Sequence, residues 1–522
     1  MLRVFQTDLS DPEFFVISLE LVPGRESFGR SVDIVKGIAA DAFADGRISV
    51  VSITDNPGGN PSLSPDVIGH EVFSVGMDVI IHFACRDLNR AGLESRALQL
   101  AMMGMKNILA LTGDYTTKGF GGQGAPVFDL DSVNLLAMLT LLNERINASG
   151  DPDGFFPGAV VSPFKYTEEE SFAQYAKLCR KIVAGAQFII TQLGYDVVKF
   201  IELHKILRWM NTDLPVLGSV YLLSPRAARA MNRGIVPGAV VPDELLAKVL
   251  KEWKSPKEGL ALAIERTARL GAILKGIGYH GIQIGGIHRS FKTVARILDR
   301  IGEIGDDWQD YVPEFTFPRK NSFYAFPEGL DQGSPPRYGL GANDLSACER
   351  GLFLFLQTSH RYFFDRQSPL APYLEKISQT LDRHRFGKKL VSWAEGTPKK
   401  LLLGCQECGD CGIQHLAYLC PESKCPKHIR NGACGGSKEG RCEVYPDKRC
   451  VWFRAYQRWL SVNRIEEMVA GCVPPRMWEL NHTSSWLNFY LKRDHQSSSN
   501  RVAQFCRTRS CSWPKNFKID KH

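Results

Sequence analysis

The sequence predicts an α/β protein, a (β/α)8 TIM barrel followed by a mixed, cysteine-rich C-terminal domain that binds a metal or a cluster. Strand-like and helix-like segments alternate through the first 300 residues, which is typical of a parallel sheet covered by helices. Eight of the fourteen cysteines crowd between Cys405 and Cys450. A chain of 522 residues is also too long for one hydrophobic core, so we expect two or three domains.

The barrel is assigned to residues 1–303. Its eight expected strands are short apolar segments at 14–20, 48–54, 79–83, 107–113, 158–163, 187–192, 215–221 and 279–285. Helical spacing of apolar residues indicates amphipathic helices at 91–104, 132–146, 168–184, 197–210, 245–275 and 288–301. Eight strand and helix pairs fit the length of a (β/α)8 barrel. An open doubly wound sheet is the alternative.

Three further segments follow the predicted barrel. Residues 304–400 begin with a connection rich in Pro, Gly and aromatic residues and continue with two expected helices, 345–363 and 370–393. The cysteine-rich domain is assigned to 401–495, with a helix at 452–469 that closes the cysteine segment. Residues 496–522 are polar, basic and aperiodic, which predicts a disordered tail.

Five expected strands of the barrel end in polar residues: Glu20, Thr54, His82, Asp114 and Gln192. The C-terminal ends of parallel barrel strands form the active-site face. Any one of these residues could be a turn residue or a helix cap. Five together predict a ligand site at one mouth of the barrel, because buried polar groups need partners.

The stretches that contain these residues resemble the methylenetetrahydrofolate reductase family, a flavin-binding (β/α)8 barrel, in order and spacing. They are Ser18-Leu-Glu20, Ser52-Ile-Thr54-Asp-Asn, His82-Phe-Ala-Cys85, Gly104-Met-Lys-Asn-Ile-Leu-Ala-Leu-Thr-Gly-Asp114 and Gly185-Ala-Gln-Phe-Ile-Ile-Thr-Gln192. The resemblance implies reduction of 5,10-methylenetetrahydrofolate to 5-methyltetrahydrofolate, or the reverse, in one-carbon metabolism and methionine biosynthesis. It implies FAD as the cofactor, with FMN as the alternative.

The resemblance also implies roles for individual residues. Glu20 matches the catalytic acid, Asp114 the aspartate between flavin and folate, and Gln192 the amide that anchors the substrate. The implied cofactor-binding residues are Thr54, His82, Gly113, Asp114, Phe128, Asp131 and Lys181. The aromatic residue that stacks on the substrate is assigned to Tyr195 or Tyr221.

Several positions depart from the family pattern. Thr112 stands where many members have Arg before the Gly-Asp pair, which removes one charge beside the cofactor. The segment 158–163 lacks the expected Tyr and His. The glycine-rich loop 119–124 is either a mobile lid or an ordinary surface loop. Cys85 and Cys179 are expected to be small, free core residues.

The crowded cysteines read Cys405-x2-Cys408-x2-Cys411-x8-Cys420-Pro, followed by Cys425, Cys434, Cys442 and Cys450. Thiolates two residues apart on a tight turn can converge on one metal centre. The run is nearer to an iron–sulfur pattern than to a zinc ribbon, although a zinc site is the alternative. Eight cysteines suffice for two four-ligand sites. The first four are the first set, with interleaved ligation as the other arrangement.

The cysteine segment carries a resemblance of its own. Leu419-Cys-Pro-Glu-Ser-Lys-Cys-Pro-Lys427, Asn431-Gly-Ala-Cys-Gly-Gly-Ser437 and Gly440-Arg-Cys-Glu-Val444 resemble a C-terminal domain found on some bacterial methylenetetrahydrofolate reductases or as their partner subunit. That resemblance implies metal or iron–sulfur binding and electron input from other proteins. The electron donor is therefore either NAD(P)H or a ferredoxin-type protein.

Composition limits the other function classes. Hydrophobic content of 44%, charged content of 23% and a net charge of +8 are typical of a soluble globular protein. No apolar run reaches the roughly 18 residues of a membrane span, and no signal region follows Met1, so we expect a cytoplasmic protein. No basic, aromatic face predicts nucleic-acid binding. A flavin- or folate-binding electron-transfer or docking subunit and a methyltransferase remain alternative functions, and a homo-oligomer or a redox-partner complex is left open.

Overall fold

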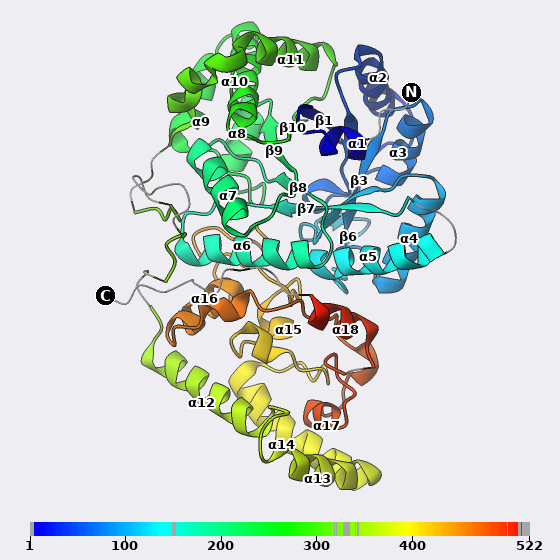
Figure 1. Cartoon of the computed structure of the whole chain (residues 1–522), viewed down its shortest axis with the longest axis vertical. Helices are drawn as coiled ribbons and strands as arrows, with labels where there is room; N and C mark the ends of the chain where they lie inside the picture. The colour runs from blue at the N-terminus through cyan, green and yellow to red at the C-terminus, as the bar shows by residue number, and fades with distance from the viewer. Residues whose placement is uncertain are drawn as a thin grey trace.

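The computed structural model describes residues 5–148, 153–317, 319, 321–326, 335–339, 341, 344–497, 499–509 and 513. The barrel, blue to green in Figure 1, lies beside a largely helical C-terminal region drawn in yellow-green to red. Eight parallel strands close the barrel in the order β1-β10-β9-β8-β7-β4-β3-β2. The predicted barrel followed by a cysteine-containing C-terminal region is therefore confirmed.

The elements of the barrel alternate as expected. The strands are β1 (Val16–Leu21), β2 (Val50–Ile53), β3 (Val79–Ala84), β4 (Asn107–Leu111), β7 (Phe156–Val161), β8 (Phe188–Thr191), β9 (Val216–Tyr221) and β10 (Gly281–Gly285). The helices are α1 (Phe5–Ser10), α2 (Arg30–Asp45), α3 (Pro65–Ser74), α4 (Arg90–Met102), α5 (Ser132–Ala148), α6 (Glu168–Val183), α7 (Val197–Trp209), α8 (Pro225–Asn232), α9 (Asp243–Glu252), α10 (Pro256–Gly276) and α11 (Lys292–Ile304). The glycine-rich loop forms a small hairpin of β5 (Lys118–Gly119) and β6 (Gly122–Gln123).

The interior of the barrel changes from apolar to polar along its axis. Alternate residues of a strand face the same side, so β1 turns Val16, Ser18 and Glu20 inward in that order. At the Val16 end, Phe5 of α1 packs edge-on against Phe156 and Phe188, with ring centroids 6.0 and 5.2 Å away. This apolar plug fills one end of the barrel and leaves the polar side chains at the opposite mouth.

One expected helix of the barrel is divided in two. The prediction of a single helix over 245–275 is wrong, because α9 ends at Glu252 and α10 begins at Pro256. Proline is favoured in the first turn of a helix but cannot continue a preceding one, since it lacks the N–H and its ring clashes with the earlier turn. The amphipathic pattern runs across this break and hides it.

The C-terminal region is built from seven further helices among the described residues: α12 (Ala347–Phe363), α13 (Ala371–Arg383), α14 (Arg385–Leu403), α15 (Pro421–Lys424), α16 (Val451–Leu460), α17 (Ser485–Tyr490) and α18 (Arg501–Thr508). The expected helix 370–393 is thus split between α13 and α14, and the expected helix 452–469 ends at Leu460. Short 3-10 segments are η1 (Pro57–Gly59), η2 (Gly305–Phe315), η3 (Ile413–Leu416), η4 (Ile465–Met468) and η5 (Trp478–Leu480).

Helix α6 is the main contact of the barrel with the C-terminal region. Helix α16 packs against it (Figure 1). The guanidinium of Arg180 donates a hydrogen bond to Ala470 O over 3.2 Å and lies 5.9 Å from the ring centroid of Trp452. Because α6 is covered by the barrel on one side and by α16 on the other, nearly all of its residues are buried.

Two expectations about the end of the chain and the cysteines are corrected. Residues 501–508 form helix α18, and a disulfide between Cys472 and Cys506 ties it to the domain, so this part of the predicted disordered tail is ordered. Cys179, expected to be a free thiol, is also disulfide-bonded, whereas Cys85 is a buried free thiol.

Within the described part of the chain, no helix is both long and apolar enough to cross a membrane.

Candidate active site and cysteine pockets

The acid of the predicted site, Glu20, lies on the inner side of β1. Gln283 of β10 donates a hydrogen bond from Nε2 to Glu20 Oε2 over 3.3 Å. Burial raises the pKa of Glu20 to about 7, and the hydrogen bond from Gln283 opposes this rise. A Cβ at Gly285 would lie 3.1 Å from Glu20 Oε1, so a glycine on the neighbouring strand leaves room for the carboxyl group.

His82 faces the same mouth from β3 as a neutral imidazole. Its Nε2 lies 2.7 Å from the hydroxyl oxygen of Ser52 on β2. Burial lowers the pKa of His82 to about 4, despite the charge of Asp55. His82 can therefore exchange hydrogen bonds near neutral pH without carrying a charge. Thr54, the predicted flavin contact at the end of β2, is also buried at this mouth.

Asp114 follows β4 after a sharp turn at Gly113, whose φ is +93°. A side chain at Gly113 would meet the Cβ atoms of Arg86 and Ala84 at 3.2 and 3.3 Å. The Asp114 carboxylate accepts a hydrogen bond from the backbone N–H of Gly58 over 3.0 Å. Burial raises the pKa of Asp114, whereas a nearby lysine of the C-terminal region, Lys427, opposes the rise.

Gln192 ends β8 and touches two other segments. Its Oε1 accepts a hydrogen bond from Leu193 N over 2.8 Å, and its Nε2 donates to Pro237 O over 3.2 Å. A Cβ placed at Gly238 would lie 3.2 Å from Gln192 Nε2 and 3.0 Å from Gly435 O. Gln192 is therefore near the cysteine-rich domain as well as the barrel.

Residues 427–443 of the cysteine-rich domain cover one side of the barrel mouth. Lys427 Nζ donates to Gly113 O over 2.7 Å. From the barrel, Lys165 Nζ donates to Gly435 O over 2.7 Å and also to Ser437 O. Residues of both domains thus line the site.

Sequence reasoning missed Lys427 and the inward-facing Gln283. Gln283 carried a usable signal, since it is a polar residue at an inward position of an otherwise apolar strand. For Lys427 the nearby signal was the glycine-rich run 431–437, which permits close backbone approach.

Three of the predicted cofactor-binding residues are engaged with protein groups. Asp131 caps α5 through Val133 N and Asn134 N, and its other oxygen accepts two hydrogen bonds from Asn431 at 3.0 and 3.1 Å. The ring of Phe128 stacks on that of Tyr115 at 6.2 Å. Lys181 Nζ, buried in α6, donates to Val160 O over 2.5 Å. The structure does not bring these three side chains together with Glu20.

The two tyrosines proposed for the substrate side lie next to each other. Tyr221 ends β9 near Gly285 and Gly286. Burial raises the pKa of Tyr221, and the negative charge of Glu20 adds a smaller rise. Tyr195 is buried and donates its hydroxyl proton to Tyr221 O over 3.1 Å. Tyr221 is therefore the one that reaches the acid.

The eight crowded cysteines separate into two groups of four. Cys405, Cys408, Cys411 and Cys420 line a cavity of about 90 Å³. Cys425, Cys434, Cys442 and Cys450 line a second cavity of about 20 Å³. In the first group Cys411 interacts electrostatically with each of the other three thiols, and in the second group Cys425 does the same. The first four cysteines along the chain thus form one group and the last four form the other, so the two groups do not interleave.

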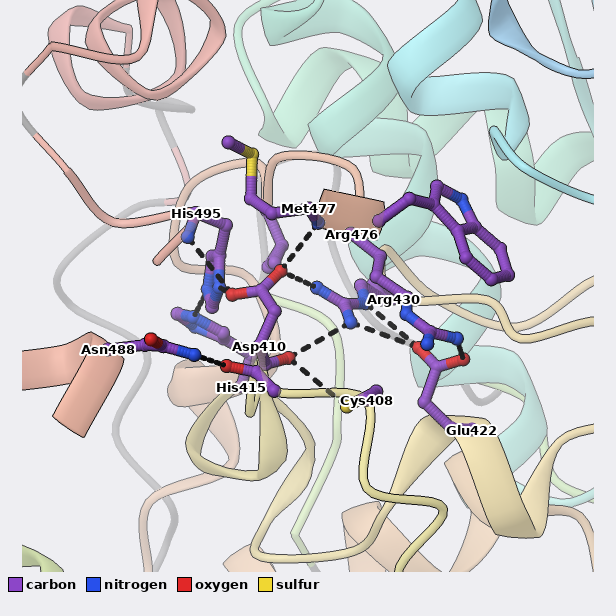
Figure 2. Close-up of polar contacts among 12 residues, drawn as sticks. Cys408, Asp410, His415, Glu422, Arg430, Arg476, Met477, Asn488 and His495 are labelled. Atoms are coloured by element: carbon purple, nitrogen blue, oxygen red, sulfur yellow. Dashed lines mark hydrogen bonds and ion pairs between the residues drawn. The ribbon is translucent and has the colours of Figure 1, made fainter. Parts of the chain in front are cut away.

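A buried charge network supports the loop of the first cysteine group (Figure 2). Asp410 accepts hydrogen bonds from Arg430 Nη1 over 3.1 Å and from His495 N over 3.0 Å, and its backbone O lies 3.6 Å from Cys408 Sγ. Arg430 also pairs with Glu422 at 3.0 Å. Burial would raise the pKa of Asp410, but His495 and Arg430 outweigh it and hold the pKa well below its usual range. The network fixes the loop between Cys408 and Cys411.

The thiol groups fit a metal site by their chemistry and not by their present spacing. Four sulfur donors around one cavity are the ligand set of zinc and iron–sulfur centres. Among the described residues, however, no three His, Cys, Asp or Glu side chains are arranged to hold a metal ion.

A closed parallel barrel with a carboxyl group of raised pKa and polar side chains at the C-terminal ends of its strands has the architecture of a barrel enzyme. Residues 7–302 match the family described as methylenetetrahydrofolate reductase, and residues 388–479 match a domain described as methylene-tetrahydrofolate reductase C terminal. The chain belongs to the methylenetetrahydrofolate reductase family.

Individual relatives are distant. The chain is 27% identical over 361 residues to methylenetetrahydrofolate reductase 1 of Schizosaccharomyces pombe, a match that covers 68% of this chain and 56% of the yeast protein. It is 24% identical over 220 residues to a probable methylenetetrahydrofolate reductase (NADPH) of Caenorhabditis elegans, covering 40% of this chain and 30% of that protein. The matched region thus spans about half or less of these relatives. A solved protein from Clostridium thermocellum that binds 5-methyltetrahydrofolic acid is similar over 57% of this chain and 98% of its own, at 13% identity and a TM-score of 0.41, too loose a likeness to support an argument.

Proposed function

We propose that the chain catalyses flavin-dependent reduction of 5,10-methylenetetrahydrofolate to 5-methyltetrahydrofolate, or the reverse reaction. The observation that carries this proposal is Glu20. A carboxyl group with a pKa of about 7 at the barrel mouth still holds a proton near neutral pH, as a general acid must. Membership of the family supports the assignment of folate as substrate.

In the proposed mechanism Glu20 gives a proton to a ring nitrogen of the bound folate. The five-membered ring then opens to an iminium ion, which accepts a hydride. The negative charge of Asp114 stabilises this developing cation, and the amide of Gln192 anchors the pterin. A bound flavin supplies the hydride.

The barrel mouth offers groups that would hold a flavin. Thr54, His82 and the Gly113–Asp114 turn are the residues assigned to it. Buried polar atoms without a partner among the described residues also lie at this end of the barrel: Gln283 Oε1, Ser162 Oγ and Gln174 Nε2. Because buried polar atoms are normally hydrogen-bonded, these atoms fit a site that a polar ligand completes. FAD is the proposed flavin, with FMN as the alternative.

The proposal is tested with anaerobically purified protein, supplied with FAD or FMN. We expect a bound flavin in the visible spectrum and turnover of methylenetetrahydrofolate, or of methyltetrahydrofolate with an artificial electron acceptor. Glu20→Gln keeps the shape of the side chain but cannot donate the proton, so kcat should fall by roughly 100-fold or more. The exposed Glu13→Gln is the matched control. Unchanged turnover in Glu20→Gln would show that the acid is misassigned.

A second candidate function is an electron-transfer or docking subunit, favoured by the second cysteine pocket. Lys427 lies two residues after Cys425 and contacts Gly113 in the barrel, so an electron carrier in that pocket would stand beside the flavin site. This function predicts bound flavin without turnover by the chain alone, whereas a methyltransferase predicts no flavin. The donor, NAD(P)H or a ferredoxin-type protein, is identified by which of the two reduces the flavin.

We further propose that each cysteine group holds a metal centre, with iron–sulfur favoured over zinc at the first. A cavity of about 90 Å³ can enclose more than one atom. A cavity of about 20 Å³ has room for roughly one ion or water, which favours a single zinc ion at the second site.

A further inference from the structure

The side chain of Lys427 leaves the cysteine-rich domain and ends inside the barrel mouth. Its ammonium donates a hydrogen bond to Gly113 O over 2.7 Å, although the two residues are 314 positions apart in the chain. The Lys427 side chain is 4% exposed and forms an ion pair with Glu443, which is 8% exposed. A buried ammonium is costly unless it is paired and hydrogen-bonded. The contact is therefore specific rather than incidental.

The strand that Lys427 meets provides no cation of its own at this point. Thr112, the residue before Gly113, is buried and donates its hydroxyl proton to Ser132 Oγ over 3.2 Å. Lys427 also stands 5.7 Å from the ring centroid of Phe128, so its position is fixed from the barrel side as well. Lys177 of α6 places an ammonium of the barrel 3.4 Å from Thr112 Oγ1, whereas Lys427 brings an ammonium of the other domain to Gly113.

Three charged groups face Asp114. Arg86, after β3, lies 3.5 Å from Asp114 O, but its guanidinium is paired with Asp87 at 2.6 Å. Glu443 and Lys427 come from the cysteine-rich domain and act on Asp114 in opposite senses. Arg86 and Lys427 therefore both donate to backbone oxygens of the Gly113–Asp114 turn, and Lys427 has the larger effect on the Asp114 carboxyl group.

We propose that Lys427 is a positioning residue of the barrel's site, which holds the Gly113–Asp114 turn and places a cation from the cysteine-rich domain beside the Asp114 carboxylate. The site is thus incomplete in the barrel alone. The importance of Lys427 and Asp114 for turnover rests on the proposed function. The contact of Lys427 with the Gly113–Asp114 turn does not depend on it.

The test is the titration of the Asp114 carboxyl group in the full-length protein, followed by NMR of ¹³C-labelled aspartate and assigned with Asp114→Asn. In Lys427→Met the pKa of Asp114 should rise by about one unit or more, because an opposite charge within a few ångströms lowers a carboxyl pKa by that amount. Lys427→Arg should restore it. The exposed Lys424→Met, three residues away, is the control.

The partner of Lys427 gives a test of opposite sign. Glu443→Gln removes a negative charge that faces Asp114, so the pKa of Asp114 should fall. A Lys427→Met protein in which Asp114 titrates as in the wild type, or a Lys424→Met protein with the same rise, would overturn the proposal. If Lys427→Met does not fold, the Glu443→Gln and Lys427→Arg titrations decide the question.

Turnover supplies a separate readout in the flavin-loaded enzyme. We expect Lys427→Met to lower kcat at least tenfold with little change in KM for folate, and Lys427→Arg to recover it. If the wild type shows no turnover, the proposed function fails while the Asp114 titration still tests the role of Lys427.

Discussion

Gln283 and Glu20 form a hydrogen bond across the seam of the barrel, where the last strand, β10, pairs with the first, β1. Gln283 Nε2 lies 3.3 Å from Glu20 Oε2, and Gln283 is the register partner of Ser18. Burial raises the pKa of the Glu20 carboxyl group, and the amide of Gln283 offsets part of that effect. The acid strength of the site is therefore set where the two ends of the barrel sheet meet.

Removing this hydrogen bond should move the pH profile of turnover. Gln283 lowers the pKa of Glu20, so Gln283→Met should raise that pKa above its value of about 7. Because the protonated carboxyl is the active form, activity should persist to higher pH, with the falling limb of kcat/KM shifted upward by roughly one unit. The exposed Gln379→Met is the control. A limb that stays in place, or moves to lower pH, would contradict this role.

The same carboxyl group should make the stability of the protein depend on pH. Burial raises the pKa of Glu20 from 4.5 to about 7, so between these values the folded state holds a proton that the unfolded state has released. Stability is thus lost as pH rises from 4.5 to 7, by about 3 kcal/mol in total. Glu20→Gln cannot ionise and should escape this loss. Urea unfolding at pH 5 and pH 8 should show the stability difference between the two proteins growing with pH, and a constant difference would refute the assignment.

The features predicted correctly from the sequence depend on local patterns. Each barrel strand is a short apolar segment that ends in Gly, Pro or a polar residue, and Glu20, His82 and Gln192 stand at such ends. Parallel strand ends gather at one mouth, so these side chains could be grouped without knowing any distance. The break at Pro256 was missed because the apolar periodicity continues across it.

The missed features depend on contacts between distant parts of the chain. The glycine-rich run 431–437 near Lys427 permits close backbone approach, but it does not indicate that the Lys427 ammonium meets Gly113, because that contact exists only after two domains pack together. Helix α18 was predicted as disordered because its sequence is polar. Its order comes from the disulfide that joins Cys506 to Cys472 and from the packing of Phe505, which is buried.

The pair of Asp131 and Asn431 should make a measurable contribution to the docking of the two domains. Asn431 donates two hydrogen bonds to Asp131, donates one to Val473 O and accepts one from Val473 N. Asn431→Ala removes the side-chain bonds and leaves buried partners unsatisfied, at about 1–3 kcal/mol. A double-mutant cycle with Asp131→Asn should give a coupling energy of at least about 0.5 kcal/mol.

The cycle can be measured by urea unfolding, with limited proteolysis between the domains as a second probe. Asn147→Ala, at an exposed position of α5, is the control. Additive effects of Asp131→Asn and Asn431→Ala would show that the two side chains do not act together.

Separate removal of the two cysteine groups should have different consequences for the barrel. Cys411→Ser should empty the first pocket and Cys434→Ser the second, because four thiols surround each cavity. Metal analysis of anaerobically isolated protein should therefore show one centre lost in each variant and both kept in Cys348→Ser, an exposed thiol outside the groups. Loss of both centres from either variant would contradict two independent sites.

Among the described residues, the second group is the one whose neighbours in the chain donate to or accept from the barrel mouth. Cys434 precedes Gly435, whose carbonyl accepts the hydrogen bond from Lys165, and Cys425 lies two residues before Lys427. An ordered second centre would hold both contacts in place, so Cys434→Ser should weaken flavin binding several-fold while Cys411→Ser leaves it unchanged. Fluorescence titration with FAD measures both values. Equal weakening in the two variants would mean that the cysteine-rich domain acts on the barrel through its overall fold and not through the segment that carries Lys427.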